Sequence, residues 1–302
     1  MTESIQYPLL TIIIPTYNRP KLLKRAVESA LLQAIEGESE DAIDIVVVDD
    51  CSPHPVALPA HPRLKIVRLS ENKGGAAARN EGARIAAGHY ISYLDDDDLL
   101  LSNMANTAIK ALRETTLPAP VAAWTGINVV NSSGEVTSTR LPPTLPKGSH
   151  FALEDIGPEK SFLCKQTLVI EKDVLQGIGG FDESFQSRVH SELFLRLNLV
   201  CSLLSVPVVT YQLMAHEGPR VSRNPELRQI SFERLVNKHR SLFEAHPKQF
   251  AQFVYRHAQV CSQRMQRKAA VQALIWAFRI HPLQSAILVS KDVAYRLSPK
   301  QS

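Results

Sequence analysis

In the N-terminal third of the chain, short unbroken apolar runs alternate with segments in which apolar residues recur at helical spacing. This alternation restricts the fold more than any other feature. Short, unbroken apolar runs rich in Val and Ile are typical of strands buried on both faces of a parallel sheet. Two longer segments, 20–31 and 74–87, carry apolar residues at the spacing of an amphipathic helix. The order strand, helix, strand, strand, helix, strand predicts a doubly wound α/β sheet. The predicted strands are Leu9–Ile14, Ile43–Val48, Leu64–Leu69 and His89–Leu94.

The rest of the chain is less regular, and its pattern changes again near Pro225. We expect further strands at 121–130, 134–139, 162–170 and 206–213, and helices at 172–177 and 192–200. Gly88 is expected to be the C′ residue that closes the helix 74–87. From Pro225 the pattern is helical and amphipathic, which predicts an α/β domain over 1–224 and a helical C-terminal extension over 225–302.

Composition argues against several other kinds of protein. The four cysteines are widely separated and form no CxxC pair, which disfavours a zinc site or a disulfide scaffold and fits a reducing compartment. The N-terminus lacks the basic start of a signal peptide, and the apolar run 269–280 is too short to span a bilayer. No basic cluster is interleaved with aromatic residues, as nucleic-acid binding would favour. The sequence therefore predicts a cytoplasmic protein that binds no nucleic acid.

Two acidic clusters follow predicted strands, at the edge where ligands bind in doubly wound sheets. Asp95–Asp98 place four carboxylates in sequence, and these would repel one another if buried without a counter-charge. Mg²⁺ or Mn²⁺ suits such oxygen ligands and makes a diphosphate a better leaving group. An exposed acidic turn is the alternative for an isolated run, and the sheet pattern favours the metal. Asp49 and Asp50 fit hydrogen bonds to a base or ribose, although one of them fits a turn or helix-cap role equally well.

At this point the chain resembles a known family. Residues 9–104 are similar to the N-terminal half of a family 2 glycosyltransferase of the GT-A fold, and the similarity continues to about two-thirds of the chain. The order and spacing of the motifs make the resemblance specific. The matching segments are TIIIPTYNRP (11–20), IVVVDDCS (45–52), ENKGGAAARNEGARIA (71–86), YISYLDDDDLL (90–100), GIGGFDESF (177–185) and ELFLRL (192–197).

The resemblance implies an inverting transferase that uses Mn²⁺ or Mg²⁺. Its donor would be a nucleotide-sugar, with UDP- or dTDP-sugars favoured, and its acceptor a hydroxyl of a saccharide or lipid-linked molecule in polysaccharide or glycolipid synthesis. Residues 1–105 would form the nucleotide-binding half and 106–224 the acceptor half. Asp97 is the implied direct metal ligand. The implied nucleotide-binding residues are Pro15, Thr16, Tyr17, Asp49, Asp50, Arg79, Asp95 and Asp96.

The chain departs from the family at the position of the catalytic base. Family members commonly place a Glu-Asp pair before the helix that matches 192–197, and here the pair is Val189-His190. A histidine can serve as a base because its ordinary pKa is about 6.5. Glu192 is a competing base, and His190 could instead be structural or bind the metal. Without the usual pair, a pseudo-enzyme that binds nucleotide-sugars without turnover is an alternative function. A nucleotidyltransferase is disfavoured because the first loop is not rich in Gly, Arg and Lys.

Two later segments carry further hypotheses. His216 is similar to a late histidine that some GT-A enzymes offer to the metal, and Arg220 fits a phosphate contact. A surface role is the alternative for both. The helix-forming segment 264–279 is basic and contains Trp276, so it fits peripheral contact with an anionic membrane at the inner face. Packing on the catalytic domain, or in a homodimer, fits that segment equally well.

Overall fold

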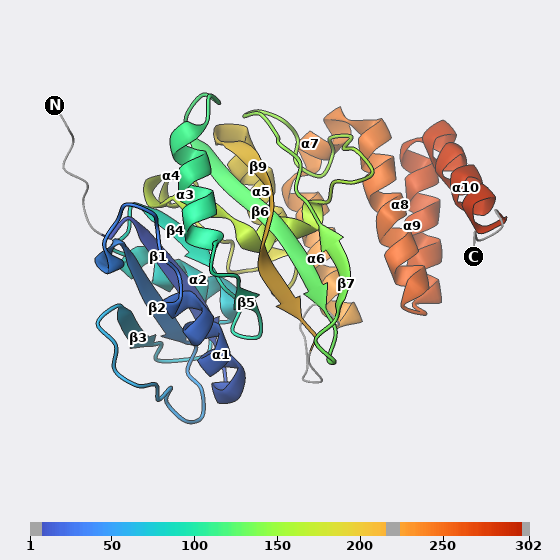
Figure 1. The fold of residues 1–302 in the computed structure, drawn as a ribbon. Helices are drawn as coiled ribbons and strands as arrows, with labels where there is room; N and C mark the ends of the chain where they lie inside the picture. The colour runs from blue at the N-terminus through green and yellow to red at the C-terminus, as the bar shows by residue number, and fades with distance from the viewer. Residues whose placement is uncertain (1–7, 216–223, 298–302) are drawn as a thin grey trace. The chain divides into compact units, whose positions relative to one another are not determined.

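The computed structural model describes residues 8–215 and 224–297. These residues form two compact units. One contains the described residues before 152 together with 156–215, and the other contains 152–155 together with 224–297. Within the described residues, every strand belongs to the first unit, and the helices from α6 onward belong to the second (Figure 1). The nucleotide-binding, acceptor and extension roles assigned to parts of the chain stay predictions.

Four parallel strands form the N-terminal half of the sheet, in the order β3-β2-β1-β4. Every residue of β1 is buried, as its unbroken apolar run predicts for a central parallel strand. Thr16 lies opposite Asp49 across β1 and β2, so these strands end together at one edge. The doubly wound pattern expected from the sequence is confirmed here. The strands are β1 (Leu10–Thr16), β2 (Ile43–Asp49), β3 (Leu64–Arg68) and β4 (Tyr90–Tyr93).

The sheet continues beyond β4 with a change of direction. The short strand β8 pairs antiparallel with both β4 and β6, and the long strands β6 and β9 run parallel side by side (Figure 1). Trp124 on β6 is fully buried among Phe151 and Phe194, and its indole N–H donates to the Pro143 carbonyl at 2.9 Å. These contacts give the second half of the sheet its own core. The strands are β5 (Leu99–Leu100), β6 (Val121–Val130), β7 (Val136–Arg140), β8 (Val169–Glu171) and β9 (Ser202–Met214).

The first helix of this unit, α1, shows how local sequence sets where a helix begins and which of its sides is buried. Pro20 stands in the first turn of α1, where its missing N–H costs nothing and its fixed φ suits a helix. The predicted apolar stripe of α1 faces the sheet, because Leu23, Ala26 and Val27 are buried. The helices are α1 (Pro20–Leu31), α2 (Gly75–Ile85), α3 (Met104–Glu114), α4 (Lys172–Gly177) and α5 (Val189–Val200), with 3₁₀ turns η1 (Glu40–Ala42) and η2 (Phe162–Thr167).

The strand predicted at 162–170 is wrong over most of its length. Phe162–Thr167 form the 3₁₀ turn η2, and only the residues from Val169 pair in the sheet. Side chains compete here with the sheet for backbone groups. The Ser161 hydroxyl accepts from Leu163 N, and the Thr167 hydroxyl donates to the Cys164 carbonyl at 2.8 Å. These local hydrogen bonds stabilise a turn that apolar composition alone did not indicate.

The role expected for Gly88 is also wrong. The C-cap of α2 is Ala86, and Gly88 has no positive φ. Its N–H donates to the Thr11 hydroxyl at 2.8 Å, and a Cβ built on it would lie 2.6 Å from Thr11 N. Glycine is therefore required because the chain passes directly against the backbone of β1.

We expect Gly88→Ala to destabilise the protein by about 1–3 kcal/mol, since the added methyl meets backbone atoms that cannot move aside cheaply. The matched control is Gly177→Ala at the end of α4, where a Cβ meets nothing within 4 Å. Chemical unfolding should separate the two variants, with Gly177→Ala near or above the wild type. Equal midpoints would contradict the close approach at Gly88.

The second unit is a group of helices with an aromatic core. Asn224 caps α6, since its side chain accepts from Leu227 N at 3.1 Å, and Pro225 opens the helix. Phe232 stacks on His257 at 3.7 Å and meets Trp276 edge-on. None of the described helices is long and apolar enough to cross a membrane. The helices are α6 (Pro225–Lys238), α7 (Arg240–Ala245), α8 (Pro247–Gln263), α9 (Arg267–Ile280) and α10 (Pro282–Leu297).

Candidate active site

The two acidic clusters predicted from the sequence meet at one edge of the sheet. Asp95–Asp98 follow β4, Asp49 is the last residue of β2 and Asp50 follows it, and β1 lies between these strands. The Thr16 hydroxyl at the end of β1 donates to Asp96 Oδ2 at 2.7 Å, which joins the strand ends directly. Such an edge of parallel strands is where ligands bind in doubly wound sheets.

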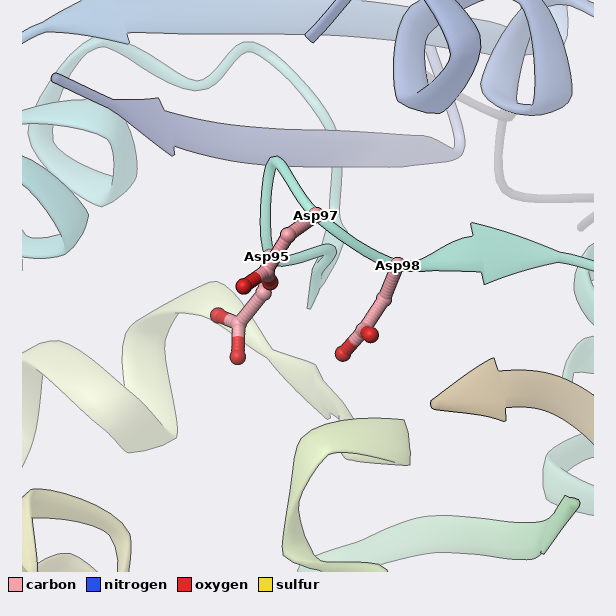
Figure 2. A group of neighbouring side chains, drawn as sticks. All are labelled: Asp95, Asp97 and Asp98. Carbon is pink, nitrogen blue, oxygen red and sulfur yellow. The ribbon is translucent and has the colours of Figure 1, made fainter. Parts of the chain in front are cut away.

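Three of the four consecutive aspartates point into the same space. One oxygen each from Asp95, Asp97 and Asp98 can be chosen so that all lie within 4.8 Å of one another (Figure 2). Asp96 is not part of this group, and its oxygens accept from Thr16 and Arg19. The sequence hypothesis selected Asp97 for the metal, and the geometry adds Asp95 and Asp98 to that group.

Asp98 is the residue of this group that the sequence hypothesis missed. It is 3% exposed, and its carboxylate accepts from the Tyr211 hydroxyl at 2.9 Å and from Met214 N at 2.8 Å. Burial, with repulsion from Asp95 and Asp97, raises the pKa of Asp98 well above its ordinary value. The run of four aspartates predicted a metal site, but it did not indicate which of the four carboxylates would join the group.

Two arginines counter part of this negative charge. Arg19 Nη1 lies 3.0 Å from Asp96 Oδ1 and 3.1 Å from Asp97 Oδ2. Arg79 pairs with Asp95, and its predicted contact with the nucleotide stays a prediction. Burial raises the pKa of Asp95, but the opposing effects, led by Arg79, outweigh burial, so its pKa is lowered. Arg19 was missed, although it stands inside the first matching motif.

The acidic group fits a hard divalent cation. Its ligand atoms are carboxylate oxygens, which Mg²⁺ and Mn²⁺ prefer. The raised pKa of Asp98 reflects its burial first, and then the repulsion from Asp95 and Asp97. A bound cation would relieve that repulsion.

The residues predicted to hold the nucleotide lie around the same edge. Pro15 and Thr16 end β1, and the Tyr17 side chain is 46% exposed beside them. Asp49 Oδ2 pairs with Arg68 at 2.8 Å, and its other oxygen accepts from Ser52 N, so it supports the loop after β2. The two oxygens of Asp50 accept from the backbone N–H groups of Lys73 and Gly74, both at 2.8 Å, which fixes the Gly-rich turn before α2.

His190 lies in the first turn of α5, within electrostatic range of Asp95. Its ring meets Phe181 edge-on at 5.4 Å. Burial, and then Arg79, lower its pKa to about 3, against an opposing effect of Asp95. The imidazole is therefore neutral at neutral pH, and a pKa this low makes it a weaker base than an ordinary histidine.

The contacts of Glu192, the competing base, favour a structural role for it. Glu192 is fully buried, and its oxygens accept from Arg196 Nε at 2.7 Å and from Arg196 Nη2 at 2.6 Å. Arg196 also donates to the carbonyls of Ile178 and Gly180, so the pair anchors the segment 177–185 to α5. A fully buried carboxylate that is paired with an arginine is typical of a structural ion pair, so we keep His190 as the proposed base. The i,i+4 spacing of Glu192 and Arg196 was the sequence signal for this ion pair.

The two remaining candidates, His216 and Arg220, lie outside the described residues. Their roles toward the metal and the phosphates stay predictions.

Comparison with known proteins shows a family and several relatives in sequence. The family model described as glycosyl transferase family 2 matches residues 11–176. The chain is 35% identical over 151 residues to the succinoglycan biosynthesis protein ExoO of Rhizobium meliloti, covering 46% of this chain and 41% of that protein. It is 25% identical over 240 residues to a chondroitin synthase of Escherichia coli, covering 76% and 32%. The chain thus spans less than half the length of these two relatives.

Among solved structures, the fold is similar to that of S. aureus TarS 1–349 in complex with UDP-GlcNAc. The TM-score is 0.61 at 19% sequence identity, over 93% of this chain and 83% of that one. This similarity is one of fold. It agrees with the GT-A architecture and the helical C-terminal region expected from the sequence.

Proposed function

This chain belongs to glycosyl transferase family 2, and we propose that it moves a sugar from a nucleoside diphosphate sugar onto an acceptor hydroxyl with inversion at C1. The observation that carries the proposal is the convergence of Asp95, Asp97 and Asp98 beside the ends of β1 and β2. A nucleotide seated on those strand ends would present its diphosphate to the acidic group.

The proposed mechanism assigns each step to a group at this edge. Asp97, with Asp95 and Asp98, would hold Mg²⁺ or Mn²⁺, which when bound supplies Lewis-acid stabilisation of the departing diphosphate. His190 accepts the proton of the acceptor hydroxyl as that oxygen forms a bond to C1 of the sugar. The bond from C1 to the diphosphate oxygen breaks on the opposite face, and the electron pair leaves with the nucleoside diphosphate. Arg79 keeps the Asp95 carboxylate ionised and directed into the site.

We also propose which nucleotide the donor carries and which kind of biosynthesis the transfer serves. UDP is the first nucleotide to test, because the family favours UDP- and dTDP-sugars and the TarS structure of similar fold holds UDP-GlcNAc. Synthesis of a surface polysaccharide or glycolipid is proposed because ExoO is a succinoglycan biosynthesis protein. The acceptor would enter over the second half of the sheet, near α5.

Thermal unfolding in the presence of UDP, dTDP, GDP or CMP tests the donor site. We expect one nucleoside diphosphate to raise the midpoint with Mn²⁺ and not with EDTA, since a ligand at one hundred times its Kd stabilises by about 2.7 kcal/mol. Incubation with the corresponding nucleotide-sugars then tests turnover. Binding without transfer or donor hydrolysis across many acceptors would favour the pseudo-enzyme. No stabilisation by any nucleotide would contradict the donor site itself.

A further inference from the structure

The positive charge of this protein is concentrated at its C-terminus. Residues 264–302 contain seven Lys and Arg residues and a single acidic residue, Asp292. The whole chain has 34 basic and 30 acidic residues, so 27 basic and 29 acidic residues remain in the first 263. Asp292 accepts hydrogen bonds from the Tyr255 hydroxyl and from Gln259 Nε2, and both donors are neutral. The strongly basic character therefore belongs to the segment that forms α9 and α10.

Each of these two helices exposes apolar side chains on one of its sides. On α9, Val271, Ile275 and Phe278 are 55%, 47% and 36% exposed, and their spacing places them on one side of the helix. On α10, Leu283 and Ile287 are 69% and 40% exposed and lie one turn apart. We call these five residues the apolar face.

The opposite side of α9 already has its packing partners. Ala273 and Ala277 are buried, and Trp276 meets Phe232 and Phe250 edge-on within the second unit. The helix is thus apolar on two sides, of which one forms the core of the helical unit. The second side has no role in that core, and a large apolar surface left exposed is typical of an interaction site.

Cations border the apolar face. Lys268 stands three residues before Val271, and Arg279 stands four residues after Ile275, so both side chains lie along the same flank of α9. Both are exposed, and Lys291 is exposed on α10. Within the part of the chain that the structure describes, none of these three cations forms an ion pair.

We propose that the apolar face of α9 and α10 lies in the interfacial layer of an anionic lipid membrane. Apolar side chains flanked by Lys and Arg, on helices too short to span, are the features of a helix that lies in the plane of a membrane surface. The charge complementarity selects lipid over a second copy of the chain, because a second copy would bring the same cations against each other. The proposal is independent of the sugar chemistry.

Sedimentation of the full chain with lipid vesicles tests this. We expect binding to vesicles of phosphatidylcholine and phosphatidylglycerol in equal amounts, and little binding to phosphatidylcholine alone. Lys268→Gln with Arg279→Gln should weaken binding roughly tenfold or more, given the contribution of each cation near an anionic surface. The matched control is Lys24→Gln with Lys110→Gln, two exposed lysines of the first unit, which should bind as the wild type does.

A second pair of variants tests the apolar contribution. Ile275→Ser with Phe278→Ser should reduce vesicle binding roughly tenfold or more, since their burial in lipid is lost. The control is Leu32→Ser, a 72% exposed leucine of the first unit. Unfolding midpoints equal to the wild type establish that the variants are folded.

Three results would overturn the proposal. They are equal binding to neutral and anionic vesicles, binding unaffected by either pair of substitutions, and no vesicle binding at all. If the last result came with a dimer in solution that Ile275→Ser with Phe278→Ser dissociates, the apolar face would instead join two copies of the chain.

Discussion

Asp97→Asn is expected to abolish sugar transfer and to remove the Mn²⁺-dependent part of nucleotide binding. The substitution keeps the size of the side chain but removes an anionic ligand from the group that Asp95 and Asp98 complete. Charge stabilisation by a bound metal ion is worth several kcal/mol in a transition state, so turnover should fall by on the order of a hundredfold or more. Turnover and nucleotide-induced thermal stabilisation, each with Mn²⁺ and with EDTA, are the two measurements.

The control for this variant is Asp41→Asn, an exposed aspartate in the turn before β2. It removes the same charge from the protein and should change neither measurement. The Asp97 variant should still unfold cooperatively without ligand. Unchanged turnover in Asp97→Asn, or stabilisation by nucleotide that stays metal-dependent, would overturn the metal assignment.

His190→Ala is expected to lower kcat while leaving the nucleotide site intact. Removal of a general base typically costs about 10²- to 10⁴-fold in rate. Because His190 would act on the acceptor hydroxyl, stabilisation by nucleoside diphosphate with Mn²⁺ should match the wild type. Added imidazole should restore part of the activity, since it can occupy the space beside Phe181 and accept the proton. A normal kcat would exclude His190 as the base, and so would a loss of nucleotide binding equal to the loss of rate.

Glu192→Gln tests whether Glu192 is structural, as its ion pair with Arg196 indicates, or is the catalytic base in place of His190. Glu192 is buried against Arg196, so we expect this variant to lose about 2–3 kcal/mol of stability, because the arginine is left without its countercharge. Its kcat per folded molecule should remain near that of the wild type. A large drop in kcat without a drop in stability would restore Glu192 as the catalytic group and contradict the role of its ion pair.

Local pattern in the sequence was enough to predict the sheet edge and its acids. The apolar runs that end at Ile14, Val48 and Leu94 predicted the strands, and parallel strands bring their carboxyl ends together. The acidic residues after those runs therefore had to meet. The register of β1 with β2, and the bond from Thr16 to Asp96, confirm that inference.

The tertiary structure alone decided which partners those residues have. Arg19 reaches Asp96 across 77 positions of sequence, and Tyr211 reaches Asp98 across 113. Gly88 must be a glycine because it passes close to the backbone of β1, a strand distant from it in sequence. Periodicity and turn residues report on neighbours in sequence, so they locate strands, helices and strand ends. Ion pairs, the direction of each carboxylate and close backbone approach depend on how distant segments pack, which no local pattern encodes.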